Sequence, residues 1–546
     1  MQIFNSPLEA FLHWETNTPD APFLNQPING GIISYSFKDV GTEARKMASA
    51  LHTYKLAQRS HIALLSKNCA HWHIADLAIM MAGHISIPIY PTLNSQSINQ
   101  ILVHSEAKAI IVGKLDDLES QKKGILDIPI ISIGLYGNAV GDLWEDFLQS
   151  QEPLLVLPKH ESNNLHTIIY TSGTTGDPKG VMHTVGNFME SVKGLITLFN
   201  LAEQSRLFSY LPIAHIAERL LETISLVLGA QVTFPESLDT FASDLEKTQP
   251  HAFFAVPRIW SKFQEKILEK LPQKRLSFLL KIPLLNGYLK KKLQQKLGLG
   301  SAQFILSGAA PLAPSLVIWF ETIGISIQQV YGMTEDCCIS HCNSPQANKV
   351  GSVGKPLEHV KVKLTTEGEI CIMNNCLMKG YYKSPEATAA VFDGEGFLKT
   401  GDIGEYDHDG FLSITGRVKD QFKTDKGKYI SPAPLELQMT KNTDIEQICI
   451  VGTGIPQPIA LITVSQLGLM KDKANLISGL ITTVNSLNPK FEKHEKIEKI
   501  IIMKEDWSVA NGLITPTLKV KRNSIEKIHQ QFYKDWFESD DIVIFE

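Results

Sequence analysis

Short runs of apolar residues alternate with longer segments in which apolar positions recur every three or four residues, throughout most of the chain. Segments with this helical period include Asn187–Phe199, Ile216–Leu228 and Leu312–Ile323. Because strands that alternate with helices form parallel sheets covered by helices, the pattern predicts an α/β fold. The short runs predict buried strands at Ile62–Leu65, Ala109–Val112, Thr167–Tyr170, Leu207–Leu211, Gln231–Phe234, Phe253–Val256, Phe304–Leu306 and Ile327–Val330.

The pattern changes after about residue 400. Gly404–Leu412 has the composition of a turn between two short strands, and the polar, charged segment Gly416–Pro432 follows it. Strands are expected again at Gln447–Val451 and Ile459–Val464, followed by helices. A chain of 546 residues also exceeds the roughly 250–300 residues that one hydrophobic core serves. We therefore expect a large domain over 1–416 and a small α+β domain over 417–546.

Charge and cysteine usage narrow the class of protein. The net charge of −5 comes from interspersed residues of both signs, so nothing in it indicates a nucleic-acid partner. Seven scattered cysteines with no secretory start are typical of a reducing, cytoplasmic setting. The apolar stretch Ala75–Ile89 is interrupted by polar residues and falls short of the ~20 residues that span a bilayer, so any membrane contact is expected to be peripheral. No pattern in the sequence addresses the oligomeric state.

One segment departs from this balance of charge. Ser261–Gly300 contains ten cations against Glu265 and Glu269, a net of +8, with leucines and isoleucines between the charges at helical spacing. One interpretation is a solvated helical hairpin. The other is a surface that attracts anionic lipid headgroups.

The main candidate for chemistry is the loop Tyr170-Thr-Ser-Gly-Thr-Thr-Gly-Asp-Pro-Lys-Gly180, which follows a predicted strand and precedes a helical pattern. Its glycines, hydroxyls and lysine can surround phosphate oxygens with backbone N–H groups and one cation. The loop is not a Walker A motif, because position 178 is proline and position 180 is glycine.

The whole string resembles the phosphate loop of the adenylate-forming superfamily, which comprises acyl-CoA synthetases, beetle luciferases and nonribosomal-peptide adenylation domains. Further segments resemble the family's other motifs in the same order, and the resemblance covers residues from about 10 to 530. It implies a large N-terminal domain of parallel and mixed sheets layered with helices, and a small mobile α+β C-terminal domain. The further segments are Leu211–Arg219, Ser307–Leu312, Gln328–Glu335, Thr400–Asp402, Gly416–Asp420 and Pro516–Arg522.

The resemblance also implies roles for single residues in binding ATP. Tyr331 should stack on adenine, Thr334 should meet the α-phosphate, and Asp402 should accept hydrogen bonds from the ribose with help from Arg417. Glu335 and Thr174 should hold Mg²⁺, which prefers hard oxygen ligands. The full ATP/AMP-binding set is Thr171, Ser172, Gly173, Thr174, Thr175, Gly176, Lys179, Gly308, Ala309, Ala310, Gln329, Val330, Tyr331, Gly332, Met333, Thr334, Asp402 and Arg417.

Three catalytic residues follow from the same resemblance: Lys519, Glu335 and His215. Lys519 aligns with the lysine that bridges the reacting carboxylate and the α-phosphate, and His215 is placed between acid and nucleotide. The position before that lysine is usually glycine and is Leu518 here, with Lys521 only two residues further on.

The second half of the reaction is expected to use another pose of the small domain. Lys419 resembles the family's hinge residue. Lys423, Gly427 and Lys428 would then contact coenzyme A.

The identity of the acid rests on further likenesses. Val256–Phe263, Thr424–Pro432 and Leu211–Arg219 resemble long-chain fatty acyl-CoA synthetases. The expected activity is therefore an ATP-dependent ligase that converts a carboxylic acid, and a long-chain fatty acid in particular, to acyl-AMP and then to the coenzyme A thioester. A medium-chain or aromatic acid, a carrier protein as acceptor, and an inactive acyl-nucleotide-binding protein stay open. Luciferase-type oxygenation has no oxygen-specific signature to support it.

A zinc site at Cys337, Cys338, His341 and Cys342 is disfavoured, because the spacing is not Cys-x-x-Cys and no second ligand pair is evident. These thiols are expected to be small buried side chains beside the nucleotide.

Overall fold

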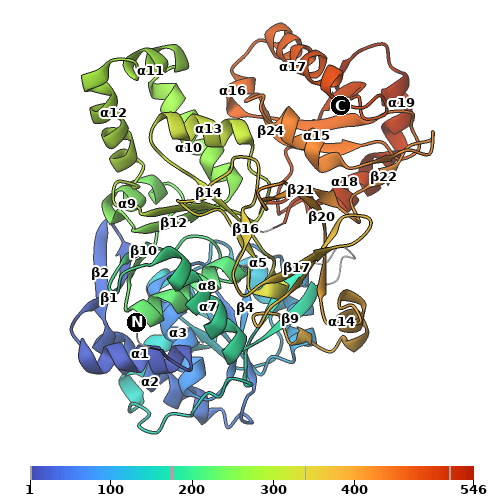
Figure 1. Cartoon of the computed structure of the whole chain (residues 1–546). Coiled ribbons are helices and arrows are strands. Elements are labelled where there is room, and N and C mark those ends of the chain that lie inside the picture. The colour runs from blue at the N-terminus through green and yellow to red at the C-terminus, as the bar shows by residue number, and fades with distance from the viewer. Residues whose placement is uncertain (1–2, 173–177, 339, 516–517) are drawn as a thin grey trace.

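The computed structural model describes residues 3–172, 178–338, 340–515 and 518–546. The N-terminal part combines four sheets, and a smaller unit from β22 onward lies at the upper right of Figure 1. This arrangement confirms the predicted α/β fold with a large multi-sheet domain and a small C-terminal domain. The exact boundary after residue 416 stays a prediction.

The largest sheet has eight strands in the order β19-β9-β8-β4-β3-β5-β6-β7. Strands β3 to β8 pair in parallel, whereas β9 pairs antiparallel with both β8 and β19, so the sheet is mixed. Its strands are β3 (His61–Leu65), β4 (Ile85–Ile89), β5 (Ala109–Val112), β6 (Ile130–Ser132), β7 (Asp142–Leu143), β8 (Leu165–Ser172), β9 (Pro178–Thr184) and β19 (Gly380–Tyr381).

Helices cover this sheet and bury its apolar side chains. Every residue of α3 (Ala70–Met81) is buried, and α2 (Phe37–Thr53) packs against it with a capping box at Ser36 and Asp39. Other helices of this part are α1 (Pro7–Asn17), α4 (Ser95–Ser105), α5 (Leu118–Gln121), α6 (Trp144–Ser150), α7 (Val185–Phe199) and α8 (Ile216–Leu228).

A five-stranded sheet carries the segments that matter most for the site. Its first three strands, β12 (Ala252–Ala255), β13 (Phe304–Ser307) and β14 (Gln328–Tyr331), are parallel, and β15 (His341–Cys342) and β16 (Lys355–Pro356) follow antiparallel. The parallel strands end at one edge, so the loops after β13 and β14 lie side by side. The helices around it are α9 (Phe241–Thr248), α10 (Pro257–Lys270), α11 (Gln273–Leu279), α12 (Pro283–Lys296) and α13 (Pro314–Thr322).

Two four-stranded sheets complete the N-terminal part. One has the order β10-β11-β1-β2, and the antiparallel other has the order β17-β18-β20-β21. The strands are β1 (Pro22–Ile28), β2 (Gly31–Ser36), β10 (Arg206–Phe208), β11 (Gln231–Thr233), β17 (Lys361–Leu364), β18 (Glu369–Met373), β20 (Leu398–Tyr406) and β21 (Leu412–Arg417), with helix α14 (Pro385–Val391) before β20.

The C-terminal unit is built on a mixed sheet of its own, β24-β25-β26-β27, with a separate hydrophobic core. Its elements are β22 (Phe422–Lys423), β23 (Tyr429–Ile430), α15 (Pro432–Met439), β24 (Ile445–Val451), β25 (Ile459–Val464), α16 (Gln466–Leu469), α17 (Lys473–Leu487), β26 (Lys499–Ile502), α18 (Arg522–His529), α19 (Tyr533–Glu538) and β27 (Val543–Phe545).

Two expectations about elements were wrong in detail. The strand expected at Leu207–Leu211 ends at Phe208. The residues that follow leave the sheet: the Leu211 carbonyl accepts from the Asn68 side chain at 2.7 Å, and Pro212 has no N–H for a ladder. The basic segment forms three helices instead of a hairpin. Pro272 and Pro283 interrupt it, each at the start of a new helix where its missing N–H costs nothing.

Within the described ranges, no helix is both long and apolar enough to cross a bilayer.

Candidate active site

Gly308 brings the loop after β13 against β14. The register pairs Ser307 with Gln329, and a Cβ added to Gly308 would lie 2.8 Å from Val330 Cγ2 and 3.0 Å from the Val330 carbonyl. Only glycine fits this approach without displacing β14. The turn continues through Ala309 at φ +66°. The loop predicted to flank adenine therefore lies beside the strand that ends in Tyr331.

Tyr331, Asp402 and Arg417 form one hydrogen-bonded group drawn from three strands. The Tyr331 hydroxyl donates to Asp402 Oδ2 at 2.7 Å, and Arg417 Nε donates to Asp402 Oδ1 at 2.6 Å. Asp402 and Arg417 are direct partners across β20 and β21. Desolvation and the Asp402 charge raise the pKa of Tyr331, and the Asp402 charge is also the main cause that raises the pKa of Arg417.

The Thr400 side chain fixes the backbone around Asp402 to the neighbouring strand β18. Thr400 Oγ1 donates to the Ile370 carbonyl at 2.8 Å and accepts from the Asp402 N–H at 3.1 Å. Gly401 adopts φ +72°, a conformation that glycine reaches without steric cost. A carboxylate has about four acceptor positions, so Asp402 can accept further hydrogen bonds, such as those of two ribose hydroxyls, while keeping both protein partners.

Glu335 is a buried carboxylate whose orientation depends on Tyr381. The Tyr381 hydroxyl donates to Glu335 Oε1 at 2.8 Å, and burial followed by the Glu335 charge raises the pKa of that phenol. The Lys179 ammonium lies 5.1 Å from the centre of the Tyr381 ring. Tyr381 thus connects the predicted metal ligand to the lysine of the phosphate loop. No motif in the sequence indicated this residue.

His183 supports the turn that carries Thr334 and Glu335. Its Nε2 donates to the Thr334 carbonyl at 2.8 Å, and Cys337 Sγ lies 3.3 Å from Nδ1. Desolvation lowers the pKa of His183 to about 4, so the ring is neutral at physiological pH. This buried histidine was also missed by sequence reasoning, because a single histidine in a strand carries no functional pattern.

His215 lies at the N-terminus of α8, where its Nδ1 accepts from the Ala217 N–H at 3.2 Å. Desolvation, and then the positive charge of Lys519, lower the pKa of His215 to about 3. The neutral ring must therefore carry its proton on Nε2. His215 can donate one hydrogen bond from Nε2 to an anionic oxygen.

The residues after His215 anchor α8 rather than face the site. Arg219 forms two 2.8 Å hydrogen bonds with Asp76 of α3, pairs also with Glu222, and lies over the Trp72 ring at 5.0 Å. The arginine and its two carboxylate partners are almost fully buried. This network fixes α8 against α3 and so positions His215.

Glu218 belongs to a second buried contact in the same helix. Asn68 Nδ2 contacts its Oε1 at 3.4 Å and also donates to Ser209 Oγ at 2.9 Å. Burial raises the pKa of Glu218 to about 8, so its carboxyl is largely protonated at neutral pH. The Glu218 carboxyl therefore adds little negative charge to this part of the protein.

Lys519 is the C-terminal residue whose charge interacts with this N-terminal group. Its charge interacts with those of Arg417, Asp402 and Glu335, and desolvation followed by Arg417 lowers the pKa of the ammonium. The residue still contacts solvent, so it stays accessible to a dissolved anion. The structure thus brings Lys519, Glu335, His215 and Asp402 into one electrostatic neighbourhood.

The residue before Lys519 explains the usual preference for glycine there. Leu518 adopts φ +63°, the left-handed conformation that costs a residue with a Cβ about 1–2 kcal/mol. The Lys519 N–H donates to Thr515 Oγ1 at 3.0 Å, and its carbonyl accepts from the Thr515 N–H at 2.7 Å. These hydrogen bonds connect Thr515 to Lys519 in spite of the strained conformation of Leu518.

The other nucleotide residues of β14 and its turn have mixed surroundings. The Gln329 side chain is buried, and its amide donates to the Ser352 carbonyl at 3.0 Å. This amide group is therefore bonded within the protein. The Met333 N–H donates to Asp336 Oδ1 at 2.8 Å. Val330, Gly332 and Met333 continue from β14 into the turn before Thr334.

The phosphate loop is described only at its two ends. In the ladder between β8 and β9, Thr171 pairs with Lys179 and Ser172 pairs with Pro178. The loop therefore leaves β8 and enters β9 at neighbouring positions of the sheet. The predicted residues Gly173, Thr174, Thr175 and Gly176 lie outside the described residues.

The predicted coenzyme A residues lie apart from this group, whereas the predicted hinge residue is close to it in the chain. Lys419 lies two residues after Arg417, the last residue of β21, and is exposed, as are Lys423 and Lys428. Gly427 turns the β22–β23 hairpin at φ +76°. In Figure 1, β22 lies at the right-hand edge, away from β14. This pose therefore brings Lys519 to the site and leaves the hairpin outside.

The four clustered thiol and imidazole residues are accounted for by packing. Cys337, His341 and Cys342 are buried and Cys338 is partly exposed. His341 Nε2 contacts the Tyr406 hydroxyl at 2.7 Å. Across the described part of the chain, no three or more His, Cys, Asp or Glu side chains gather in a way that could hold a metal.

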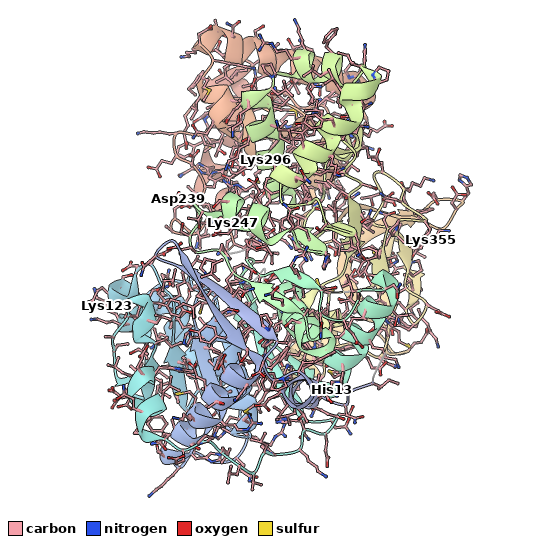
Figure 2. The ribbon with its side chains drawn as sticks, turned by 90° about the vertical axis from the view of Figure 1, so that its left-hand side faces the viewer. His13, Lys123, Asp239, Lys247, Lys296 and Lys355 are labelled. Atoms are coloured by element: carbon pink, nitrogen blue, oxygen red, sulfur yellow. The ribbon has the colours of Figure 1, made fainter. Side chains whose placement is uncertain are left out.

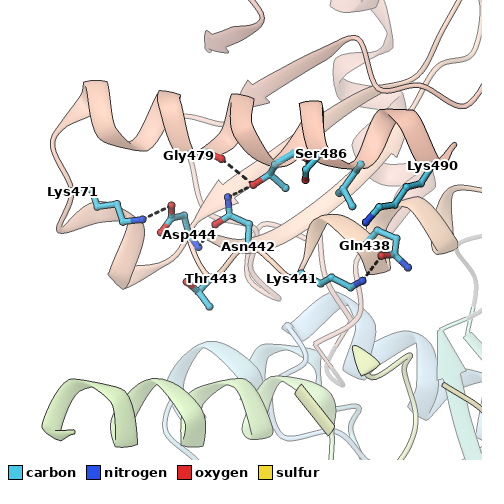
Figure 3. A pocket seen from close by; sticks show the side chains of 11 residues that line it. Gln438, Lys441, Asn442, Thr443, Asp444, Lys471, Gly479, Ser486 and Lys490 are labelled. Atoms are coloured by element: carbon cyan, nitrogen blue, oxygen red, sulfur yellow. Dashed lines mark hydrogen bonds and ion pairs between the residues drawn. The ribbon is translucent and has the colours of Figure 1, made fainter. Parts of the chain in front are cut away.

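A separate hollow of about 460 Å³ lies in the C-terminal unit between α15 and α17 (Figure 3). Its lysines have partners within it, since Lys471 Nζ lies 2.7 Å from Asp444 Oδ2 and Lys441 contacts Gln438. It contains none of the predicted site residues.

Two family models match the parts of the chain that contain Tyr331 and Lys519. Residues 11–382 match the family described as AMP-binding enzyme, and residues 419–539 match the AMP-binding enzyme C-terminal domain. The chain belongs to the AMP-binding enzyme family. As a member of this adenylate-forming family, it is an acid ligase that binds ATP and a carboxylic acid.

Named AMP-binding enzymes resemble the chain over most of its length. It is 28% identical to long-chain-fatty-acid–CoA ligase 5 of Rattus norvegicus, over 92% of this chain and 84% of that protein. It is 27% identical to long-chain-fatty-acid–CoA ligase FadD15 of Mycobacterium bovis, over 94% of this chain and 93% of that protein. The A-PCP didomain of carboxylic acid reductase from Segniliparus rugosus in complex with AMP shares the fold, with a TM-score of 0.82 and 19% identity. The match covers 98% of this chain and 83% of that chain.

Proposed function

We propose that this AMP-binding enzyme is a fatty acid–CoA ligase that activates a long-chain fatty acid as acyl-AMP and transfers the acyl group to coenzyme A. The observation that carries the proposal is the hydrogen-bonded group of Tyr331, Asp402 and Arg417, in which the charges of Asp402 and Arg417 act on Lys519 of the C-terminal unit. The names of the relatives and the segments Val256–Phe263 and Thr424–Pro432 support the choice of acid.

The first step requires two anions to meet. A carboxylate oxygen of the acid attacks the α-phosphorus of ATP, and pyrophosphate leaves. Lys519 offsets the repulsion between carboxylate and triphosphate, and its accessibility to solvent allows it to contact either anion. The Nε2 proton of His215 adds one neutral donor without adding charge.

The nucleotide would be held by the group on β14, β20 and β21. The Tyr331 ring offers a face for adenine beside the Gly308–Ala310 loop, and Asp402 has acceptor capacity left for the ribose. Arg417 keeps the Asp402 carboxylate in place.

The residues also fit a Mg²⁺ ion held together with ATP. Mg²⁺ in such sites uses one or two protein carboxylates and completes its shell with phosphate oxygens and water. Glu335 offers a buried carboxylate with one oxygen bonded to Tyr381, and Thr174 would be the second protein ligand. When bound, the ion would neutralise phosphate charge.

Thioester formation would follow in a second pose. The coenzyme A sulfur attacks the acyl carbon, and AMP is expelled. Rotation about Lys419 would withdraw Lys519 and bring Lys423, Gly427 and Lys428 toward the site. The exposure of Lys423 and Lys428 in the present pose is consistent with that exchange.

The test is ATP–pyrophosphate exchange by the purified protein with a panel of carboxylic acids of increasing chain length and with aromatic acids. Exchange that is strongest with long-chain acids is expected. Strongest exchange with medium-chain or aryl acids would contradict the choice of acid, and no exchange with any acid would contradict adenylation itself.

The acceptor is tested by offering coenzyme A or an acyl carrier protein to the enzyme with its preferred acid and ATP. Accumulation of the coenzyme A thioester is expected. Acyl transfer to the carrier protein alone would replace the proposal with an acyl-AMP ligase that loads a carrier.

A further inference from the structure

The helices α11 and α12 carry the most one-sided charge in the described structure. From Gln273 to Lys296 the sequence has seven cations and no acidic residue, whereas the whole chain has a net charge of −5. The remainder of the protein is therefore strongly acidic. In Figure 1 the two helices form the upper left corner, on the opposite side from the C-terminal unit.

Large apolar side chains are exposed among these cations. Phe278 is 66% exposed, Tyr288 is 65% exposed and Leu285 is 43% exposed. Lys274, Arg275, Phe278 and Leu279 line a surface hollow of about 270 Å³. Exposed apolar groups that gather on one surface with polar residues around them mark interaction sites in proteins.

The opposite side of the same helices is fixed to the protein. Leu276 is fully buried, and Leu289 and Leu293 pack against the core around α10 and α13. Trp319 Nε1 donates to Gln273 Oε1 at 2.7 Å, and Gln294 Nε2 donates to the Gly324 carbonyl at 2.7 Å. The exposed faces of α11 and α12 are therefore held in place by packing and hydrogen bonds on the opposite faces of these helices.

We propose that the exposed face of α11 and α12 docks on an anionic lipid bilayer. We call this face the basic corner and define it by Lys274, Arg275, Phe278, Lys281, Leu285, Tyr288, Lys291 and Lys292, all of which are exposed. Lysine and arginine attract anionic headgroups, and the aromatic and leucine side chains enter the boundary between headgroups and acyl chains.

Other partners fit this surface less well. A nucleic acid would use the cations but gains little from aliphatic side chains such as Leu285. A second copy of the chain would bring two surfaces of the same charge together. The acidic remainder of the protein is repelled by an anionic bilayer, so the basic corner is the part that turns toward it.

The lipid-docking proposal does not depend on the proposed function, and its test needs no activity. The full-length protein is mixed with vesicles of phosphatidylcholine alone, or with about 30% phosphatidylglycerol, and the bound fraction is measured by flotation. Binding to the anionic vesicles that weakens with added salt is expected. Equal binding to both vesicles, or none to either, would overturn the proposal.

Charge reversal at three exposed lysines tests the surface itself. The variant K274E/K281E/K291E is expected to bind anionic vesicles at least about tenfold more weakly than the unmodified protein. The matched control K123E/K361E/K504E reverses three exposed lysines elsewhere on the molecule and has the same net charge. Lys123 lies in the lower half of Figure 2 and Lys296 of α12 in the upper half. Equal weakening by both variants would show a net-charge effect and overturn the assignment to this surface.

The apolar part is tested with F278S/Y288S. This variant is expected to retain binding at low salt and to lose the fraction that resists high salt, since that fraction depends on insertion of the rings. Circular dichroism and the melting temperature verify that each variant is folded. Retention of the protein on RNA without vesicle binding would assign the surface to nucleic acid instead.

Discussion

Lys519 is the single residue on which the proposed chemistry depends most. Among the described residues its charge interacts with Arg417 and Glu335, and desolvation lowers the pKa of its ammonium. A substrate anion would reverse that effect, because an opposite charge favours the protonated lysine. The protonated form of Lys519 is thus less favoured when the site holds no anion. It is favoured most when the carboxylate and the triphosphate are both bound, which is when its charge offsets their repulsion.

Replacement of this lysine should separate the two half-reactions. Lys519→Ala is expected to slow acyl-adenylate formation by about 10²–10³-fold, the usual cost of one electrostatic contact in a transition state. Thioester formation from supplied acyl-AMP should continue. ATP–pyrophosphate exchange and single-turnover thioester assays measure the two steps.

Lys521→Ala is the matched control, because Lys521 lies two residues further along the same basic run. It should leave the exchange rate close to that of the unmodified enzyme. A loss of both half-reactions in Lys519→Ala, or a larger loss in Lys521→Ala, would show that the role was assigned to the wrong residue.

His183 should make stability depend on pH. Burial lowers the pKa of this ring to about 4, below the ordinary value of 6.5. Between these values the unfolded chain binds more protons than the folded chain. The stabilisation is therefore fully present above pH 6.5 and is lost as the pH falls toward 4.

The variant His183→Gln keeps a donor for the Thr334 carbonyl but does not titrate. Between pH 7 and pH 5 it is expected to lose roughly 2 kcal/mol less free energy of unfolding than the unmodified protein. Urea denaturation at both pH values measures the difference. The control His408→Gln changes a side chain that is 85% exposed and should follow the unmodified protein. Parallel curves for all three proteins would contradict the assignment.

At the scale of elements, α8 is positioned by a contact with α3 that lies far from the substrate. Arg219 reaches Asp76 across the core, and the same helix begins with His215. A buried ion pair contributes little compared with an apolar pair of the same shape, but the loss of one partner leaves a buried charge. The position of His215 therefore depends on a carboxylate in another helix.

Asp76→Asn should reveal this dependence. The free energy of unfolding is expected to fall by about 1.5–3 kcal/mol, because Arg219 loses its bidentate partner and keeps only Glu222. Denaturant unfolding gives this value. Asp239→Asn, at an exposed position labelled in Figure 2, should change it by less than about 0.5 kcal/mol. Equal effects of the two substitutions would exclude the buried network as the cause.

At the scale of the whole molecule, an ion pair spans the large and small units. Arg258 of α10 lies 2.5 Å from Glu446 of β24. Arg258 lies in the first turn of α10 and Glu446 in the C-terminal sheet, and the contact exists in the pose in which the Lys519 charge interacts with Asp402 and Glu335. The pair therefore stabilises the present pose, which we propose is the one suited to acyl-adenylate formation.

Reversal of this pair should bias the equilibrium between poses. Arg258→Glu places two carboxylates together, so the exchange rate is expected to fall by about fivefold while thioester formation from acyl-AMP is unaffected. The double variant R258E/E446R restores the pair and should recover exchange to within about twofold. An exchange rate that falls further in the double variant would contradict a role of this pair in domain pose.

The sequence allowed much of the fold and the site to be anticipated. Helix α8 and strands β5 and β25 have the bounds that periodicity predicts, because local hydrophobic spacing determines which segments become helix or strand. Element ends were less predictable. β10 stops at Phe208, and the Leu211 carbonyl that follows accepts from the Asn68 side chain, a contact between distant segments that has no local signal.

The sequence by itself determined the order of the elements, the family motifs and the positions of Tyr331, Asp402, Glu335 and Lys519 within them. Only the tertiary structure decided which side chains hold those residues. Tyr381 reaches Glu335 across 46 positions, and His183 reaches the Thr334 carbonyl across 151. Such contacts depend on the order of strands in a sheet and on the pose of a second domain, and neither leaves a periodic or local pattern in the chain.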